Sequence, residues 1–192
     1  MKILSLYNNS CALELFHWLS LQGHEIVLCS EPLDIEWCIQ QTFDLTVSYT
    51  YRYILSKQIL EALKNNAVNI HNSYLPWNRG ADPNLWSIVD QTPRGVTLHY
   101  MNTELDKGDI IAQRLVVDDL ENATLKSSYE RLDQTAKQLF QDAFQYYEYW
   151  PFMRKKACGK GTYHSSADAA TIKKMIPSYE ISVFAFKKIT KI

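Results

Sequence analysis

The sequence predicts an α/β fold with a mostly parallel sheet and helices on both faces of that sheet. Strand-like apolar runs alternate with runs at helical spacing through the N-terminal part of the chain. This β-α-β-α-β-α-β order implies right-handed crossovers between parallel strands. A second pattern begins at Gly95, where two β-rich runs flank an acidic loop, and it predicts a neighbouring antiparallel pair of strands.

The elements of the first part have recognisable starts and ends. Predicted strands cover residues 3–7, 25–29, 45–49 and 67–70, and predicted helices cover residues 11–22, 35–41 and 56–65. Asn8-Asn9-Ser10 supplies turn and N-cap chemistry before the first helix, and Gly23 fits its C-cap. Ser56 is expected to cap the third helix.

The second part adds longer elements and a less regular end. A helix is predicted over 82–89, strands over 95–101 and 110–117 on either side of the acidic loop 102–109, and a long helix over 124–147. After Pro151 the chain is basic and irregular, and residues 181–186 are β-prone. We therefore expect a core domain at 1–150 with a Rossmann-like sheet and a short C-terminal extension at 151–192.

Composition excludes several classes of protein. The chain has 192 residues and a net charge of -1, which favours one domain and argues against bulk electrostatic capture of nucleic acid. Its four cysteines form no CxxC pair and match no zinc spacing, so no metal is predicted. The polar N-terminus and the lack of a run of roughly 20 apolar residues predict a cytoplasmic protein without a signal peptide or membrane span.

Missing motifs narrow the chemistry further. The turn after the first strand, residues 8–10, has no glycine, which argues against a dinucleotide site or a P-loop. Gly-x-Ser-x-Gly is also absent, which removes the usual nucleophile of α/β-hydrolases.

Asn69 and His71 are the first candidates for chemistry. They lie two residues apart at the end of a predicted strand, so both side chains point to the same face. The carboxyl ends of parallel strands are where ligands bind in such sheets. An amide donor beside an imidazole suits oxyanion stabilisation and proton transfer. Taken alone, the pair is better explained by a strand end followed by a turn.

Asp106 is the second candidate. A carboxylate near His71 would orient the ring and favour its protonated form. Asp106 and Asp109 flank Gly108, however, and the same residues are common in plain turns. Their shared tight loop gives no sign of the sugar cleft that a glycoside hydrolase needs.

The residues after His71 form a third candidate set. Trp77 and Trp86 can stack on a flat ligand, and Arg79 can take a phosphate. The alternative is that Trp86 is a core residue and that Arg79 pairs with Asp82.

These motifs together resemble the folate-dependent formyltransferases, which use N10-formyltetrahydrofolate. The resemblance rests on Asn-x-His-x-Ser-x-Leu-Pro at 69–76 followed by Arg-Gly, on Asp-x-Gly-Asp at 106–109, and on the stretches 52–55 and 92–99. It implies that Asn69, His71 and Asp106 are the catalytic residues. It also implies that the pterin is held, largely by backbone groups, at Tyr53, Ile54, Leu55, Thr103, Glu104 and Leu105.

The stretch 75–87 and the sequence Gly161-Thr162-Tyr163-His164 are most similar to the sugar N-formyltransferases. That resemblance implies formylation of the amino group of a nucleotide-linked amino-deoxysugar, in O-antigen or cell-surface glycan biosynthesis. The expected substrate-binding residues are Asn8, Asn9, Ser10, Trp77, Asn78, Arg79, Gly80 and Asp82. Two alternatives stay open: formylation of a carrier-bound aminoacyl group, as in peptide synthetases, and a non-catalytic protein that binds folate or nucleotide.

The implied partners are small molecules, the folate and a nucleotide sugar, with no nucleic acid, membrane or metal.

Other folate-dependent subfamilies fit the sequence less well. Glycinamide-ribonucleotide enzymes carry a glycine in the turn after the first strand, where this chain has residues 8–10. Methionyl-tRNA formyltransferases add a C-terminal RNA-binding domain, for which we expect no room. The related folate hydrolases add an N-terminal domain. Sugar formyltransferases often dimerise through a longer C-terminal part, so a homodimer is an open expectation.

Overall fold

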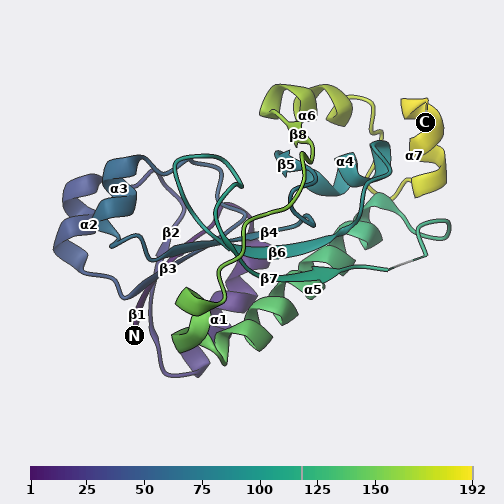
Figure 1. Ribbon diagram of the computed structural model, residues 1–192. Coiled ribbons are helices and arrows are strands. Elements are labelled where there is room, and N and C mark those ends of the chain that lie inside the picture. Colours follow the sequence, from purple (N-terminus) through teal and green to yellow (C-terminus); the bar gives the residue numbers. More distant parts are fainter. Residues whose placement is uncertain (118, 192) are drawn as a thin grey trace. The chain divides into compact units, whose positions relative to one another are not determined.

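The computed structural model describes residues 1–117 and 119–191, so Asp118 and Ile192, the last residue of the predicted extension, lie outside the described residues. A six-stranded sheet has the order β2-β1-β3-β4-β6-β7 (Figure 1). Its strands are β1 (Lys2–Leu6), β2 (Glu25–Cys29), β3 (Leu45–Tyr49), β4 (Ala67–His71), β6 (Gly95–Tyr100) and β7 (Ile110–Leu115). The pairs β1–β2, β1–β3 and β3–β4 are parallel, and β6 is antiparallel to β4 and β7. The predicted fold class is confirmed.

The chain divides into two compact units, and each is assembled from three stretches of sequence. The first unit comprises residues 1–71, 98–111 and 148–156, and the second comprises 72–97, 112–147 and 157–192.

The first unit contains the parallel strands and the helices that connect them. These helices are η1 (Ser10–Ala12), α1 (Leu13–Leu21), α2 (Ile35–Gln41) and α3 (Lys57–Ala62). Leu4 and Leu6 of β1 pack in one buried cluster with Cys38 of α2 and Leu60 of α3. In Figure 1, α1 lies below the strands while α2 and α3 lie above them. Side-chain caps explain where the helices start: Asn9, Asp34 and Ser56 accept hydrogen bonds from backbone N–H groups.

Predicted bounds agree closely with the structure in this unit. The strands at 25–29 and 45–49 and the helix at 35–41 have the predicted bounds. The helix predicted over 56–65 ends at Ala62, because Lys64 and Asn65 take left-handed backbone conformations with φ of 56° and 52°. Such conformations terminate an α-helix.

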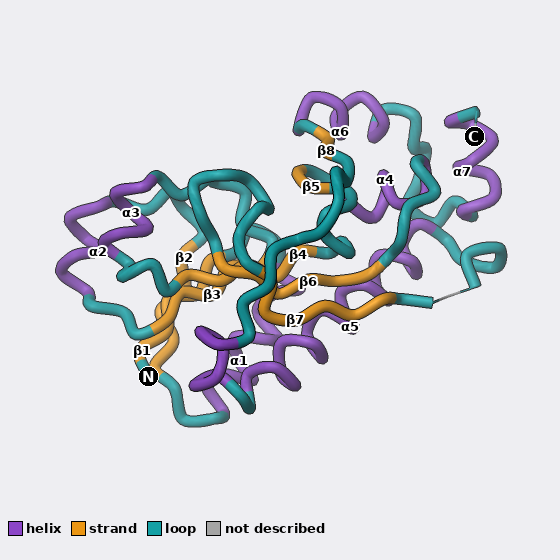
Figure 2. The backbone as a smooth tube through the Cα atoms, in the orientation of Figure 1, coloured by secondary structure: helices purple, strands orange, loops and turns teal. Residues whose placement is uncertain are grey.

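The second unit has its own hydrophobic core. Its elements are β5 (Arg79–Gly80), α4 (Pro83–Val89), α5 (Leu125–Phe144), β8 (Tyr163–His164), α6 (Ser166–Lys173) and α7 (Val183–Thr190). Leu85, Leu125, Ile172 and Phe186 are buried together and belong to four different helices. The 3₁₀ helix η2 (Tyr147–Phe152) runs from the second unit into the first. Figure 2 shows the loops that separate these short elements.

The end of the chain departs from the sequence prediction. Residues 181–186 are β-prone, but α7 begins at Val183, with the Ser182 side chain accepting a hydrogen bond from the Ala185 N–H. Val183 and Phe186 are three residues apart, so the helix buries both in the core of the second unit. Burial of this apolar stripe outweighs the weak β propensity. The helix α6 and the strand β8 are also absent from the prediction of an irregular C-terminal region.

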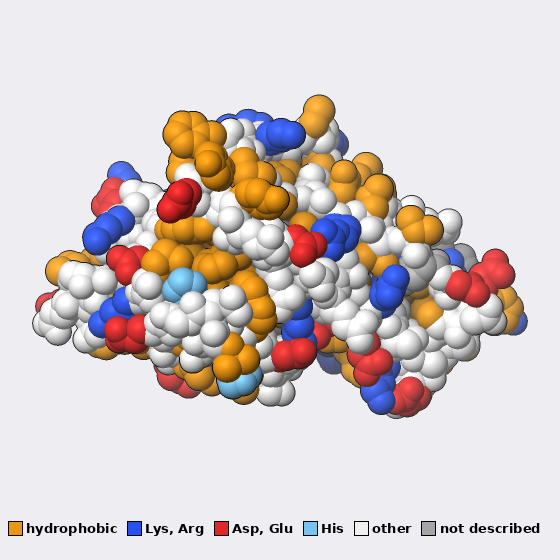
Figure 3. Space-filling view, turned by 90° about the horizontal axis from the view of Figure 1, so that it is seen from below, with side chains coloured by type: hydrophobic (Ala, Val, Ile, Leu, Met, Phe, Trp, Pro, Cys, Tyr) orange, Lys and Arg blue, Asp and Glu red, His pale blue; other side chains and the backbone are white. Residues whose placement is uncertain are grey.

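The surface carries both signs of charge. On the face shown in Figure 3, acidic and basic side chains are interspersed among apolar and neutral ones. Within residues 1–117 and 119–191, no helix combines the length and hydropathy that a membrane span requires.

Candidate active site

Strand β4 places two polar side chains side by side. Ser48 of β3 is the register partner of Asn69, and β6 flanks the other edge of β4. Asn69 and His71 are two residues apart on this strand, so their side chains lie on the same face of the sheet. His71 is buried, with 8% of its surface exposed. The predicted placement of this pair at a strand end is therefore what the structure shows.

Asp106 reaches the same face from the loop between β6 and β7. Its carboxylate is 3.6 Å from His71 Nε2 through Oδ2 and 3.5 Å from Asn69 Nδ2 through Oδ1. The carboxylate is 7% exposed, and the residue has a left-handed φ of 52°. The three predicted catalytic residues thus come together within the first unit. The distances are long for hydrogen bonds, but catalytic hydrogen bonds commonly tighten once substrates bind.

Gly108 explains why this loop can approach the sheet so closely. A Cβ atom at Gly108 would lie 1.6 Å from the Tyr100 carbonyl oxygen, a distance that no side chain tolerates. Tyr100 N donates to the Asp109 carbonyl at 2.8 Å and closes the hairpin. The Asp-x-Gly spacing therefore sets the position of the Asp106 carboxylate.

A fourth polar side chain, His99, belongs to the same cluster and was missed by sequence reasoning. It is 2% exposed, and its Nε2 lies 3.6 Å from Asp106 Oδ1 and 3.4 Å from Asn69 Nδ2. Its Nδ1 lies 2.8 Å from the Tyr100 carbonyl oxygen, which can only accept, so Nδ1 donates. In the neutral ring, Nε2 then accepts from the Asn69 amide. A histidine in a largely apolar predicted strand was the signal that could have found it.

The cluster can perform acyl-transfer chemistry. The Asp106 carboxylate lies between two imidazoles, His71 on one oxygen and His99 on the other. The imidazole rings of His71 and His99 are nearly perpendicular, with centroids 6.5 Å apart. An amide donor and an imidazole held by a buried carboxylate can stabilise a developing oxyanion and move a proton.

The segments predicted to hold the pterin lie in the same unit, and their side chains differ in exposure. Ile54 and Leu105 are exposed apolar side chains, at 69% and 40%, whereas Leu55 is buried in the core. Leu55 can thus contact a pterin only through its backbone. Thr103 and Glu104 are exposed, and Tyr53 is half-buried with its ring 5.2 Å from that of Tyr51.

Tyr51 fixes the start of the segment that contains Tyr53. Burial, assisted by the nearby Cys29 and Tyr53, raises the pKa of the Tyr51 hydroxyl above its ordinary value. The hydroxyl therefore stays neutral and donates to the Glu31 carbonyl oxygen at 2.6 Å.

The turn after β1 is held by its own side chains. Asn8 Nδ2 donates to the Ser30 carbonyl at 2.7 Å, and Asn8 Oδ1 accepts from Arg52 N at 2.9 Å. The Asn9 side chain caps η1, and Ser10 is exposed at its first position. The amides of Asn8 and Asn9 thus have structural partners, which leaves Ser10 as the exposed hydroxyl of the predicted set.

The remaining predicted substrate residues lie in the second unit. Asn78 is buried and donates to the Thr92 hydroxyl at 2.7 Å. The Arg79 guanidinium donates to two backbone carbonyls, those of Lys160 and Thr162, at 3.5 and 3.4 Å. Asp82 forms an ion pair of 2.8 Å with Lys173. Trp77 and Gly80 are half-buried. These residues are thus neighbours in one loop that the C-terminal extension contacts.

The family model described as "Formyl transferase" matches residues 36–144, which include all four residues of the cluster. The chain belongs to the formyl transferase family. The matched region begins at α2 and ends with α5, so it covers the candidate active site and the greater part of the sheet.

Two kinds of relative resemble this formyl transferase. The methionyl-tRNA formyltransferase of Listeria monocytogenes serotype 4a (strain HCC23) is 35% identical over 111 residues, which are 57% of this chain and 35% of the relative. The chain thus matches about a third of the length of that curated relative. The formyltransferase PseJ from Anoxybacillus kamchatkensis, crystallised with UDP-4,6-dideoxy-4-formamido-L-AltNAc and tetrahydrofolate, is 37% identical, with a TM-score of 0.82 over 97% of both chains.

More distant structures share the fold. Rv3404c from Mycobacterium tuberculosis, described as a likely sugar N-formyltransferase, has a TM-score of 0.81 at 22% identity over 98% of this chain and 86% of its own. At this identity the similarity shows the fold alone.

Proposed function

We propose that this formyl transferase moves a formyl group from N10-formyltetrahydrofolate to the amino group of a nucleotide-linked amino-deoxysugar. The observation that carries the proposal is the convergence of Asn69, His71 and Asp106 within 3.6 Å in the first unit. The acceptor class is supported by the similarity to PseJ, which spans 97% of both chains and whose structure holds a UDP-linked formamido sugar and tetrahydrofolate.

Asn69 and His71 would act on the formyl oxygen. Attack by the acceptor amine places negative charge on that oxygen. The half-buried Asn69 amide and the buried His71 imidazole are preorganised donors on one face of the sheet. Donors of this kind contribute about 3–4 kcal/mol each to the lowering of an activation barrier.

Asp106 would handle the proton that the amine loses. Its carboxylate contacts His71 and Asn69, so it can orient the imidazole and accept the proton directly or through water. Transfer of that proton towards the leaving nitrogen of the folate completes the exchange without a metal. Holding the two substrates in contact supplies about 7–11 kcal/mol of the barrier reduction in reactions of this type.

The alternative acceptor with a specific observation behind it is methionyl-tRNA. The identity to the Listeria enzyme is 35%, close to that of PseJ, but it covers only 57% of this chain. The similarity to PseJ includes the C-terminal extension, which is why we favour the sugar.

The test measures formyl transfer with the amine that corresponds to the PseJ ligand, UDP-4-amino-4,6-dideoxy-L-AltNAc. We expect mass spectrometry to show the addition of one formyl group in the presence of N10-formyltetrahydrofolate. Asp106→Ala and His71→Ala should lower kcat by about 100-fold or more while the protein stays folded. His17→Ala is the matched control, because His17 is an exposed residue of α1.

Three results would count against the proposal. Transfer to methionyl-tRNA but not to any amino-sugar nucleotide would replace the acceptor and keep the chemistry. If the protein binds folate but transfers formyl to neither acceptor, a non-catalytic binding protein would be favoured. Near-normal rates in both alanine variants would refute the assigned roles.

A further inference from the structure

A short segment of the C-terminal extension contacts the loop that follows the catalytic strand. We call residues 76–81 the acceptor loop and residues 159–164 the strap. Both belong to the second unit. The inference below rests on the proposed function, because the acceptor loop contains residues expected to contact the nucleotide sugar.

The acceptor loop has an unfavourable backbone conformation. Asn78 and Gly80 both have left-handed backbones, with φ of 51° and 93°. A residue with a side chain adopts this region at a cost, and it persists only where the surroundings hold it in place. The loop therefore depends on bonds to other parts of the chain.

Thr162 of the strap supplies those bonds. Its hydroxyl accepts from Asn78 N at 2.8 Å and donates to Asn78 Oδ1 at 3.0 Å. Its carbonyl accepts from Arg79 N at 3.1 Å and from Arg79 Nε at 3.4 Å. One residue thus fixes both the backbone and the side chains of the two central residues of the loop. Asn78 is 1% exposed, so water does not replace these partners.

Close backbone approach fixes the register between the two segments. A Cβ atom on Gly161 would lie 1.9 Å from the Pro76 carbonyl oxygen, and one on Gly80 would lie 2.1 Å from the His164 carbonyl oxygen. The strands β5 and β8 are paired in parallel, with Arg79 opposite Tyr163. Only glycine fits at these two positions, so a shift of the strap by one residue would create clashes.

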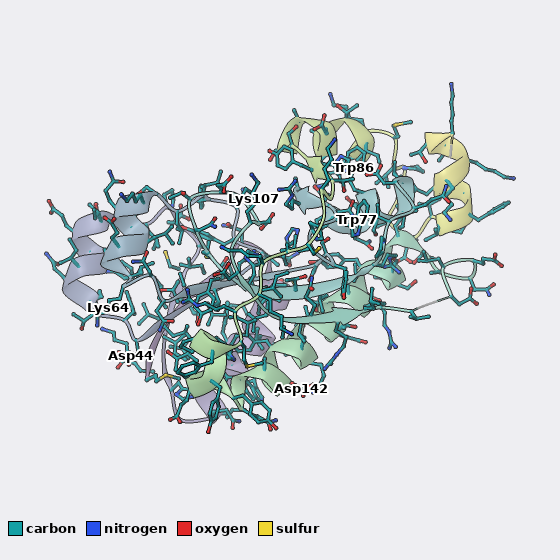
Figure 4. The ribbon with its side chains drawn as sticks, viewed as in Figure 1. Asp44, Lys64, Trp77, Trp86, Lys107 and Asp142 are labelled. Carbon is teal, nitrogen blue, oxygen red and sulfur yellow. The ribbon has the colours of Figure 1, made fainter. Side chains whose placement is uncertain are left out.

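The strap is itself anchored at its far end. The His164 ring stacks on Trp86 with centroids 3.8 Å apart and an angle of 2° between the planes. Its Nε2 donates to Asp90 Oδ2 at 2.7 Å. Trp86 lies close to β5 and β8 in Figure 4, where Trp77 of the acceptor loop is also labelled. The anchor belongs to α4 and the residue that follows it, outside the acceptor loop.

We infer that Thr162 is a positioning residue for the sugar-nucleotide acceptor. It holds Asn78 and Arg79, and through them the acceptor loop, in the conformation that receives the substrate.

The test compares Thr162→Val, which removes the hydroxyl at nearly constant volume, with Thr162→Ser, which keeps it. We expect the valine variant to raise KM for UDP-4-amino-4,6-dideoxy-L-AltNAc by about tenfold or more, since an unpaired buried partner has a cost of that size. KM for N10-formyltetrahydrofolate should stay within about twofold of wild type, because the catalytic cluster is built in the other unit. The serine variant should restore the acceptor KM.

Thr171→Val is the matched control, since the Thr171 hydroxyl donates only to the Ala167 carbonyl within the exposed face of α6. Hydrogen exchange of the Asn78 and Arg79 amides gives a second readout that needs no substrate. We expect faster exchange in Thr162→Val than in Thr162→Ser. Thr162→Ala provides a second deletion of the hydroxyl if the valine variant does not fold.

The outcomes separate this inference from the proposed function. If the wild type formylates no amino-sugar nucleotide, the proposed function fails. Unchanged hydrogen exchange of the Asn78 and Arg79 amides in Thr162→Val and Thr162→Ala would overturn the positioning role of Thr162 on its own. An acceptor KM that stays at the wild-type value, or equal rises in both KM values, would also overturn it.

Discussion

Replacement of His99 tests whether the active site is a group of four residues instead of three. His99 contacts Asn69 and Asp106 through Nε2 and the Tyr100 carbonyl through Nδ1. His99→Phe keeps a ring of similar size and removes both nitrogens. His99→Asn keeps a donor near the position of Nδ1 and removes the group that faces Asp106.

The magnitudes follow from these contacts. Loss of the donor to the buried Tyr100 carbonyl should lower the free energy of unfolding of His99→Phe by about 1–3 kcal/mol. Without the Nε2 atom, Asp106 and Asn69 can shift, and a misplacement of about 1 Å costs up to about 100-fold in rate. We therefore expect kcat to fall by about 10- to 100-fold in both variants, with stability largely kept in His99→Asn.

The assay is steady-state formyl transfer combined with urea unfolding, and His17→Phe on the exposed face of α1 is the control. A His99→Asn variant with wild-type kcat would refute the reasoning, because it would show that Asp106 and Asn69 hold their positions unaided. A fall in kcat that is explained by partial unfolding of the variant would also refute it, because His99 would then stabilise the core without positioning Asp106 or Asn69.

Two further predictions concern stability. Gly80→Ala should lower the free energy of unfolding by about 3 kcal/mol or more, because its Cβ would meet the His164 carbonyl at 2.1 Å, whereas Gly23→Ala, with φ of 84° and open space, should cost only about 1 kcal/mol. Equal losses in urea unfolding would contradict this. The hydrogen bond from the Ser165 side chain, more than any other cause, holds the pKa of Asp168 below its usual value of 3.8. The stabilisation of α6 by ionised Asp168 is therefore complete above pH 3.8 and disappears as the pH falls through the folded-state pKa. NMR titration of the α6 amides should show this loss. A titration midpoint at or above 3.8 would exclude the hydrogen bond between Ser165 and Asp168.

The parts of the fold that were predicted from the sequence are those with local signals. The helix at 35–41 has an aspartate cap, and the strands at 25–29 and 45–49 are short apolar runs between breakers. Asn69 and His71 were placed together because strand geometry alone puts residues i and i+2 on one face. Asp106 could be brought to them only by resemblance, since its approach depends on the loop closed by Gly108.

What the sequence could not reveal depends on contacts between distant segments. In the sequence, His99 looks like any other residue of a buried strand. Its role becomes visible only when the structure places the Asp106 carboxylate beside it. Thr162 lies in a stretch that the resemblance marked, but its role has no local signal, because its partner Asn78 is far away in the chain. Residues 183–190 form a helix only because the core of the second unit receives Val183 and Phe186.

The interleaving of the two units has a consequence for synthesis on the ribosome. The strands β1, β3 and β4 can pair soon after residue 71 has emerged, since their partners are already translated. The acceptor loop follows immediately, yet the strap that gives it its shape is translated more than 75 residues later. The acceptor loop would therefore take its conformation only as the last segment leaves the tunnel, and a nascent chain that stalls before Thr162 would carry Asn69, His71 and Asp106 without a formed acceptor loop.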